Sequence, residues 1–362
     1  MSQPTFRATS LLRRALALGL LAASLSGGAA WAGGGSAATG VKPTAVSKDY
    51  DLYRSGNAAD ALPPQPATQQ LVLMGGGLDV DDAFRAMIAK ARGGTAAKVD
   101  VVILRTSGAD GYNPYLMAMD GVDSVESIVL KNRAAASAPE VLNLVNRADV
   151  LFLAGGDQST YIALWAGTPL EAAMKDAVAR RVPFGGTSAG LAVLGQFDYS
   201  GANQSVSSAE ALANPYNRNV TLDRSFLNAL PLMAGVITDA HLVTRDRMGR
   251  LVTFLARLSA DGWAGWQALR GIGVDEQTAV VVDGDIATVM GNDDGLGGRT
   301  GRAYFLKPTM APTTVQAKKP LTFRSLQVEK RVAGGRYNLA TWPTESPYFI
   351  SVEAGVVMPN PY

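Results

Sequence analysis

Short apolar runs alternate with segments of helical periodicity over residues 69–300 of the chain. The apolar runs are bounded by glycine or polar residues, which is typical of buried strands. The predicted strands are residues 71–74, 99–104, 125–130, 150–154, 182–185, 235–238, 271–274, 279–282 and 286–290. Helical spacing is found in residues 81–92, 139–147, 168–181 and 247–258, and near Tyr115. This alternation predicts an α/β catalytic domain in which a mostly parallel sheet is covered by helices on both faces.

Three further segments depart from this alternation. Residues 33–68 are rich in Gly, Ala, Ser and Pro, which predicts a linker or an extended arm against the domain surface. Residues 196–230 show an indistinct pattern, and we expect a long irregular insertion that lines a pocket. Residues 301–362 contain strand-like runs at 321–328 and 348–357, which predict a β-rich C-terminal extension packed on the same domain.

Residues 1–32 have the features of an export signal. Three arginines precede a short apolar run at residues 15–25, and Ala30-Trp31-Ala32 matches the small-residue cleavage pattern. The apolar run is shorter than the roughly 20 residues that span a bilayer. We therefore expect a signal peptide cleaved near Ala32, and a secreted or periplasmic protein that has no membrane association after cleavage.

Charge and cysteine content exclude several kinds of site. Lys and Arg total 33 against 31 Asp and Glu, so the formal net charge of +2 does not indicate nucleic acid binding. The 362 residues include no cysteine, which excludes disulfides and thiolate metal sites. We expect no metal and no cofactor. The chain has one histidine, so His241 is the one candidate base if the protein is a covalent hydrolase that uses imidazole.

One serine lies in a nucleophile-elbow pattern, Gly186-Thr187-Ser188-Ala189-Gly190. A strand that turns sharply into a helix here would expose Ser188 at the top of the sheet. The flanking glycines allow a close backbone approach, and the N–H of Ala189 would face the same pocket and stabilise a developing oxyanion. The pattern by itself is also compatible with a tight strand–helix junction that has no catalytic role.

His241 follows the predicted strand 235–238, at the sheet edge where open α/β proteins bind ligands. A carboxylate would orient the imidazole and stabilise its charged form. Asp275 and Glu276 end the predicted strand 271–274, and their side chains should point to opposite faces, so only one can serve. The residues alone do not choose between them. A structural role for the lone histidine is the alternative reading.

Further polar groups follow two of the predicted strands. At the end of strand 150–154, the Gly156 amide would complete an oxyanion hole, while Asp157 and Gln158 would grip a polar substrate. A helix cap at Asp157 is compatible with that role. Three arginines after the histidine either bind substrate carboxylates through bidentate contacts or form a solvated helix face. They are Arg245, Arg247 and Arg250.

Four of these segments, taken in order, resemble the cyanophycinase and aspartyl dipeptidase family of serine peptidases. The segments are residues 155–158, 186–190, 239–242 with the three arginines, and 271–276. The resemblance covers roughly residues 71–340. It implies a three-layer α/β/α fold similar to class I glutamine amidotransferases (flavodoxin-like), with serine where amidotransferases carry cysteine.

The resemblance also implies roles for individual residues. Ser188 would be the nucleophile, His241 the base and Glu276 the acid, and we expect them to converge at one edge of a single sheet. The resemblance assigns the substrate pocket to Gln158, Asp239, Arg245, Arg247 and Arg250. Exported members look most like extracellular cyanophycinases, which cleave cyanophycin, a poly-aspartate with arginine on each side-chain carboxyl, to β-aspartyl-arginine dipeptides. A homodimer is common in the family.

The chain departs from the family pattern at the pocket rim. Ala240 stands where the family commonly has Gln, and residues 75–79 read Gly-Gly-Gly-Leu-Asp in place of Gly-Gly-Ala-Glu-Asp. Ala240 and the predicted insertion at residues 196–230 motivate an alternative function, a related serine peptidase that acts on α-aspartyl dipeptides or another Asp-containing peptide. A non-catalytic exported binding protein is the alternative of a different class.

Overall fold

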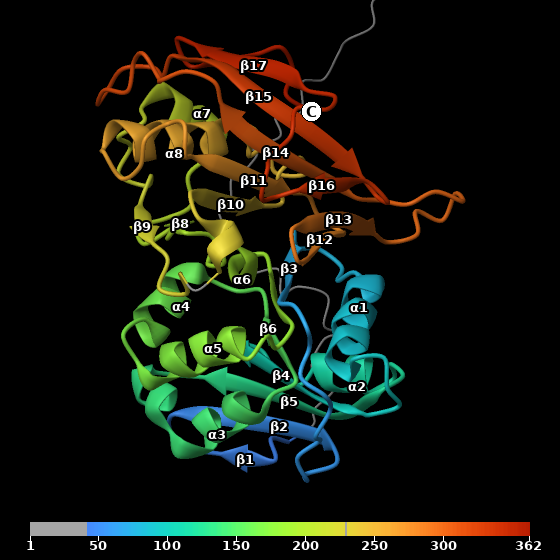
Figure 1. Cartoon of the computed structure of the whole chain (residues 1–362). Coiled ribbons are helices and arrows are strands. Elements are labelled where there is room, and N and C mark those ends of the chain that lie inside the picture. The colour runs from blue at the N-terminus through green and yellow to red at the C-terminus, as the bar shows by residue number, and fades with distance from the viewer. Residues whose placement is uncertain (1–41, 229) are drawn as a thin grey trace, which may run out of the picture. The chain divides into compact units, whose positions relative to one another are not determined.

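The computed structural model describes residues 42–228 and 230–362. The predicted signal peptide at residues 1–32 therefore lies outside the described residues, as does the first part of the predicted linker. The strands of the described chain form two sheets, and Figure 1 shows the helices arranged around them. The helices are α1 (Asp81–Arg92), α2 (Tyr112–Met117), α3 (Pro139–Arg147), α4 (Gln158–Trp165), α5 (Pro169–Ala179), α6 (Ala189–Ala192), α7 (Ser208–Ala213) and α8 (Met248–Ala260), with 3₁₀ turns at Arg133–Ser137 and Pro231–Met233.

The first sheet has a parallel centre flanked by antiparallel strands. Its order within the described chain is β1 (Ala45–Val46), β2 (Tyr50–Gly56), β5 (Val122–Leu130), β4 (Val99–Arg105), β6 (Val150–Leu153), β7 (Phe184–Thr187), β3 (Gln70–Met74), β12 (Thr278–Asp283), β13 (Ile286–Gly291) and β16 (Arg336–Asn338). The five strands from β5 to β3 pair in parallel, which brings the carboxyl ends of β6, β7 and β3 to one edge.

Helices cover both faces of this parallel centre. Alternate residues of β3 show the division, because Leu71 and Leu73 pack into the cluster that includes α3 and α5, whereas Val72 and Met74 pack into the cluster that includes α1 and α2. The two pairs of helices lie on opposite sides of the sheet in Figure 1. Every residue of β3, β4, β6 and β7 is buried, which explains why these strands contain few polar residues. The predicted α/β fold class is confirmed.

The second sheet carries the C-terminal strands. Its order within the described chain is β18 (Val356–Met358), β17 (Tyr348–Glu353), β15 (Phe323–Val332), β14 (Arg302–Pro308), β11 (Arg270–Val274), β10 (Val236–Ala240), β8 (Phe197–Tyr199) and β9 (Leu222–Arg224). β10 is parallel to both β11 and β8, and the strands from β14 to β18 are antiparallel. The β-rich character predicted for residues 301–362 is thus confirmed, but the strands are divided between two sheets where we expected one.

Two segments are more regular than the sequence predicted. β2 lies within the stretch predicted as a linker or extended arm, yet it pairs along its whole length with β5. The stretch predicted as an irregular insertion, residues 196–230, contains β8, α7 and β9. Both segments contain polar residues at positions that pair with other strands, so their apolar patterns are too weak to show strands.

Local capping follows the sequence closely. Thr168 caps α5 through its side chain, which accepts from the Glu171 N–H at 3.5 Å, and Pro169 takes the first helical position.

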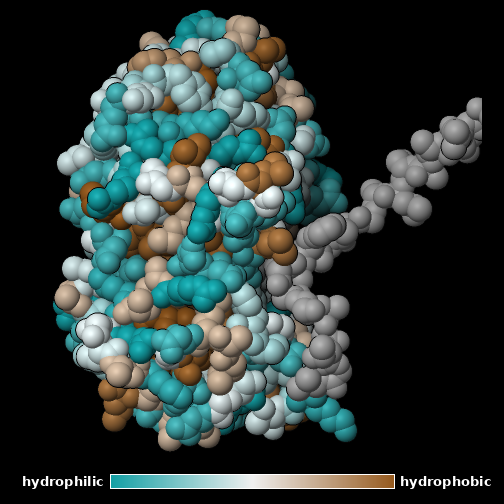
Figure 2. Space-filling view, turned by 90° about the vertical axis from the view of Figure 1, so that its right-hand side faces the viewer, coloured by the Kyte–Doolittle hydropathy of each residue, from teal (hydrophilic) through white to brown (hydrophobic). Residues whose placement is uncertain are grey.

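Hydrophobic residues on the face shown in Figure 2 are interspersed with hydrophilic ones. None of the helices built from residues 42–228 and 230–362 combines the length and apolar character needed to cross a membrane.

Candidate active site

Ser188 occupies a strained turn between β7 and α6. Its backbone has φ 53° and ψ −112°, and its N–H donates to the Met74 carbonyl of β3 at 3.0 Å. A Cβ at Gly186 would lie 2.5 Å from the Gly190 carbonyl carbon, and a Cβ at Gly190 would lie 2.2 Å from the Leu153 carbonyl oxygen. Both flanking positions therefore require glycine, and the geometry is that of a nucleophile elbow.

His241 follows β10 and faces the serine. The Ser188 Oγ lies 2.7 Å from His241 Nε2, within hydrogen-bonding distance. The histidine backbone is left-handed, with φ 52°, and its N–H donates to the Gly75 carbonyl at 2.9 Å. The imidazole is buried, which limits competition from water for its nitrogen atoms.

Glu276 lies on the other side of the imidazole. Its Oε1 is 2.5 Å from His241 Nδ1, whereas the neighbouring Asp275 pairs with Arg302 at 3.1 Å. Ser188 follows a strand of the first sheet and His241 a strand of the second, and Glu276 lies in the connection between β11 and β12, which links the two sheets. The three side chains are therefore within hydrogen-bonding distance, although they do not come from a single sheet as we expected.

The electrostatic environment favours a neutral imidazole. Burial lowers the pKa of His241 far below its ordinary value, and the charges of Arg245, Arg247 and Arg250 lower it further. A neutral imidazole that donates from Nδ1 to the carboxylate leaves its Nε2 lone pair free to accept the serine proton. This arrangement can activate the hydroxyl of Ser188 as a nucleophile.

A glycine run packs directly against this group. Gly76 has φ +92°, and a Cβ there would lie 2.3 Å from His241 Cε1. A Cβ at Gly77 would lie 3.1 Å from the Glu276 Cβ. From the sequence we placed these glycines only at the rim of the site. Their role in packing against the imidazole was missed, and the uninterrupted run of three glycines at residues 75–77 was the signal that could have shown it.

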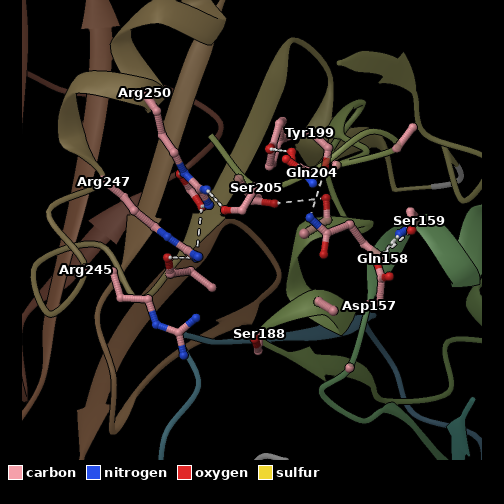
Figure 3. Close-up of a pocket in the computed structure, with 18 of the residues that line it drawn as sticks. Asp157, Gln158, Ser159, Ser188, Tyr199, Gln204, Ser205, Arg245, Arg247 and Arg250 are labelled. Atoms are coloured by element: carbon pink, nitrogen blue, oxygen red, sulfur yellow. Dashed lines mark hydrogen bonds and ion pairs between the residues drawn. The ribbon is translucent and has the colours of Figure 1, made fainter. Parts of the chain in front are cut away.

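Ser188 opens onto a pocket of about 440 Å³ that is rich in polar side chains. In Figure 3, Arg245, Arg247 and Arg250 lie on one side of the pocket, and Asp157, Gln158 and Ser159 lie on the other. Gly156 and Ala189 also line it. Ala189 is the first residue of α6, where a backbone N–H has no partner within its own helix. The pocket thus has cations at one end and hydrogen-bonding groups at the other.

Two of the charged residues assigned to the pocket pair with each other. Arg250 donates to both oxygens of Asp239, at 2.7 and 2.6 Å, and both side chains are buried. The Arg250 guanidinium also lies 4.9 Å from the centre of the Tyr199 ring. The charges of this pair are thus largely directed at each other, so the pair forms a rigid wall.

The other two arginines are more available to a ligand. Arg247 donates to the Ala240 carbonyl at 2.9 Å, and burial lowers the pKa of its guanidinium to about 9, which leaves it charged at neutral pH. The Arg245 side chain is 42% exposed, and its Nε lies 3.6 Å from the Glu276 Oε1. Arg245 therefore lies beside both the pocket and the acid that faces the imidazole.

The pocket's remaining wall comes from the segment predicted as an irregular insertion. Residues 201–205 follow β8 and line the pocket, as expected for that segment. Gln158 Nε2 donates to the Tyr199 carbonyl at 3.2 Å, so this residue connects α4 to the end of β8. Asp157 caps α4 by accepting from the Ser159 N–H at 2.9 Å.

Within residues 42–228 and 230–362, no cluster of three or more histidine or acidic side chains could hold a metal ion.

Comparison with known proteins identifies relatives of this chain. The model of peptidase family S51 matches residues 120–290, a range that includes Ser188, His241 and Glu276. A cyanophycinase of Trichormus variabilis is 27% identical over 229 residues, which cover 60% of this chain and 66% of that protein. A cyanophycinase of Synechococcus elongatus is also 27% identical over 229 residues, covering 61% of this chain and 62% of the relative. The matched region therefore spans less than two thirds of the length of either relative.

Solved structures show a weaker likeness. The crystal structure of a peptidase from an acI-B1 actinobacterium aligns with a TM-score of 0.47 and 15% sequence identity, covering 75% of this chain and 97% of that one. The likeness to a family therefore depends on the sequence matches. On these matches, the chain is similar to the S51 family of peptidases.

Proposed function

We propose that this protein is a serine-type peptidase in which Ser188, His241 and Glu276 form the catalytic triad. The observation that carries the proposal is the continuous pair of contacts, 2.7 Å from serine to imidazole and 2.5 Å from imidazole to carboxylate. A binding protein has no need of a hydroxyl, a neutral base and an acid aligned in this order.

The reaction follows from this geometry. His241 Nε2 takes the Ser188 proton as Oγ attacks the scissile carbonyl, and Glu276 stabilises the imidazolium that forms. The amides of Ala189 and Gly156 donate to the oxyanion of the tetrahedral intermediate. The imidazolium then protonates the leaving amine, the C–N bond breaks, and an acyl-enzyme remains. A water molecule, deprotonated by the same imidazole, releases the acid and restores the serine.

The substrate we propose is cyanophycin, on which the names of the curated relatives are based, with β-aspartyl-arginine dipeptides as products. Such a polymer presents carboxylates and guanidinium groups. The charges of Arg245 and Arg247 suit a carboxylate, and the free oxygen of Asp157 at the opposite end suits a guanidinium. The paired Asp239 and Arg250 would shape the pocket rather than bind substrate directly.

A second candidate substrate is a short α-aspartyl peptide. Ala240 lines the pocket, so the position where the family commonly carries Gln lacks an amide that could contact the substrate. Incubation with insoluble cyanophycin, followed by analysis of released dipeptides, separates the two candidates. Cleavage of Asp-containing dipeptides without release from the polymer would favour the second.

Replacement of the nucleophile tests the catalytic proposal. We expect Ser188→Ala to lower turnover by several orders of magnitude, on the scale known for triads, with an unchanged melting temperature. Wild-type protein should also be labelled at Ser188 by a serine-directed fluorophosphonate. Absence of both labelling and hydrolysis would leave a non-catalytic binding protein as the better description.

The proposal includes export and assembly. Residues 1–32 have the composition of a cleavable signal, so the mature protein should be recovered outside the cytoplasm with an N-terminus near Gly33. The resemblance to the family also implies a homodimer, which analytical ultracentrifugation of the mature protein tests. A protein retained with its first 32 residues, or a monomer at micromolar concentration, would contradict the respective part.

A further inference from the structure

The carboxylate next to the proposed acid is fully engaged with the turn that follows His241. Asp275 Oδ1 accepts from the N–H of Val243 at 3.1 Å and from the N–H and hydroxyl of Thr244, both at 2.9 Å. Its Oδ2 lies 3.1 Å from Arg302 Nη2. Asp275 is 2% exposed, so its carboxylate has little access to water as a substitute partner.

The turn that Asp275 holds has an unfavourable backbone. His241 and Asp246 both have left-handed conformations, with φ 52° and φ 46°. Such conformations persist only where surrounding contacts hold them in place. On the N-terminal side, the His241 N–H is held by the Gly75 carbonyl at 2.9 Å. On the C-terminal side, Asp275 holds the amides of Val243 and Thr244. The Tyr362 hydroxyl, which lies 2.8 Å from Asp246 Oδ1, and the Ser208 hydroxyl, which donates to the Asp246 carbonyl, hold the end of the turn.

Asp275 is itself held rigidly by β14. Its N–H donates to the Arg302 carbonyl at 3.0 Å, while the Arg302 guanidinium pairs with its carboxylate. The aspartate is thus fixed at both backbone and side chain, and it transmits the position of β14 to the turn that carries the imidazole.

We propose that Asp275 is a positioning residue that sets the orientation of His241 toward Ser188. This inference rests on the proposed function. The requirement is for an acceptor oxygen at the Oδ1 position, so asparagine, which keeps that oxygen, should substitute, and alanine should not. Glu276 faces the imidazole, and Asp275 holds the backbone that carries it.

The experiment measures the rate of fluorophosphonate labelling at Ser188 per folded molecule, together with kcat and KM on the substrate. We expect Asp275→Ala to lower the labelling rate and kcat by about 10- to 100-fold with little change in KM, as for a displaced catalytic group. Asp275→Asn should restore the rate to within about threefold of wild type. Asp275→Ser, which is polar but too short to reach both amides, replaces the alanine variant if that protein does not fold.

A matched control separates positioning from stability. Asn338 Oδ1 accepts from the N–H groups of Ala340 and Thr341, both at 2.9 Å, in a turn outside the pocket. Asn338→Ala should lower the melting temperature and leave the labelling rate unchanged. Wild-type labelling in the Asp275→Ala or Asp275→Ser protein, or an asparagine variant as slow as either, would overturn the inference. A wild-type protein that neither labels nor hydrolyses would instead overturn the proposed function.

Discussion

Replacement of Gly76 by alanine should disable the site through a single methyl group. The added Cβ would lie 2.3 Å from His241 Cε1 and 2.6 Å from Nε2. Atoms in van der Waals contact lie about 3.5–4.0 Å apart. The ring, the glycine backbone or both must therefore move by more than about 1 Å to relieve the overlap.

A movement of that size removes the contact with the nucleophile. The distance from Ser188 Oγ to His241 Nε2 is 2.7 Å, and a retreat of about 1 Å takes it beyond the range of a hydrogen bond. Misplacement by about 1 Å can lower the rate about 100-fold. Alanine at φ +92° adds a backbone penalty of roughly 1–2 kcal/mol, which lowers stability without acting on the chemistry.

A control variant separates these two effects. Gly334 has φ +84° and has no atom within 4 Å of its would-be Cβ, so Gly334→Ala carries the backbone penalty alone. The measurements are kcat/KM, the labelling rate of Ser188 and the melting temperature of both variants. We expect both variants to melt below the wild-type temperature, Gly76→Ala at least as far below as the control because of its overlap, and we expect the loss of activity to be confined to Gly76→Ala. Activity of that variant within about threefold of the control would refute the packing argument.

Three further predictions concern charge and pH. Because burial and the arginine charges lower the pKa of His241 from its ordinary value of 6.5, the imidazole stays unprotonated below pH 6.5, and labelling of Ser188 should persist there. Arg245→Gln should raise the pKa of His241 and move the acid limb of the labelling profile to higher pH. An acid limb that does not move would contradict the effect of Arg245 on the imidazole. Arg250→Ala leaves Asp239 buried without its bidentate partner, so chemical denaturation should show a loss of about 3–5 kcal/mol in the free energy of unfolding, and a loss below about 1 kcal/mol would speak against the pair. Asp198 is fully buried, and its carboxylate has no hydrogen-bond partner in the described part of the chain, so burial raises its pKa well above 3.8. The folded state then binds this proton more tightly than the unfolded state, so the free energy of unfolding falls as pH rises above 3.8. The gain in free energy of unfolding from Asp198→Asn should therefore grow between pH 4 and 8. A gain that is the same at both pH values would contradict the burial argument.

The parts of the fold that could be predicted are those in which burial alone shapes the sequence. β4 is covered on both faces, so residues 99–104 form an apolar run that needs no knowledge of its neighbours. β2 could not be predicted in this way. It includes Asp51 and Arg54, and Arg54 gains its partner, Glu126 at 3.2 Å, only after β5 lies beside it. The division into two sheets likewise depends on pairings between distant strands, which periodicity does not record.

The candidate site divides in the same way. The residues around Ser188 and His241 could be singled out because a glycine-flanked serine and a lone histidine are local signals. Asp275 and Glu276 are adjacent carboxylates, and the choice between them depends on which one faces a ring carried by another strand. The pairing of Arg250 with Asp239 crosses eleven positions between a helix and a strand, so spacing along one helix cannot reveal it.

The connection from β11 to β12 carries Glu276 across from one sheet to the other, while Ser188 and His241 each extend from a different sheet. Neither sheet therefore carries all three side chains of the proposed triad. A chain in which each sheet had formed, but the two had not yet come together, would be chemically inert. The recovery of turnover during refolding would accordingly report the association of the two sheets. It would occur later than the recovery of the spectroscopic signals of strands and helices.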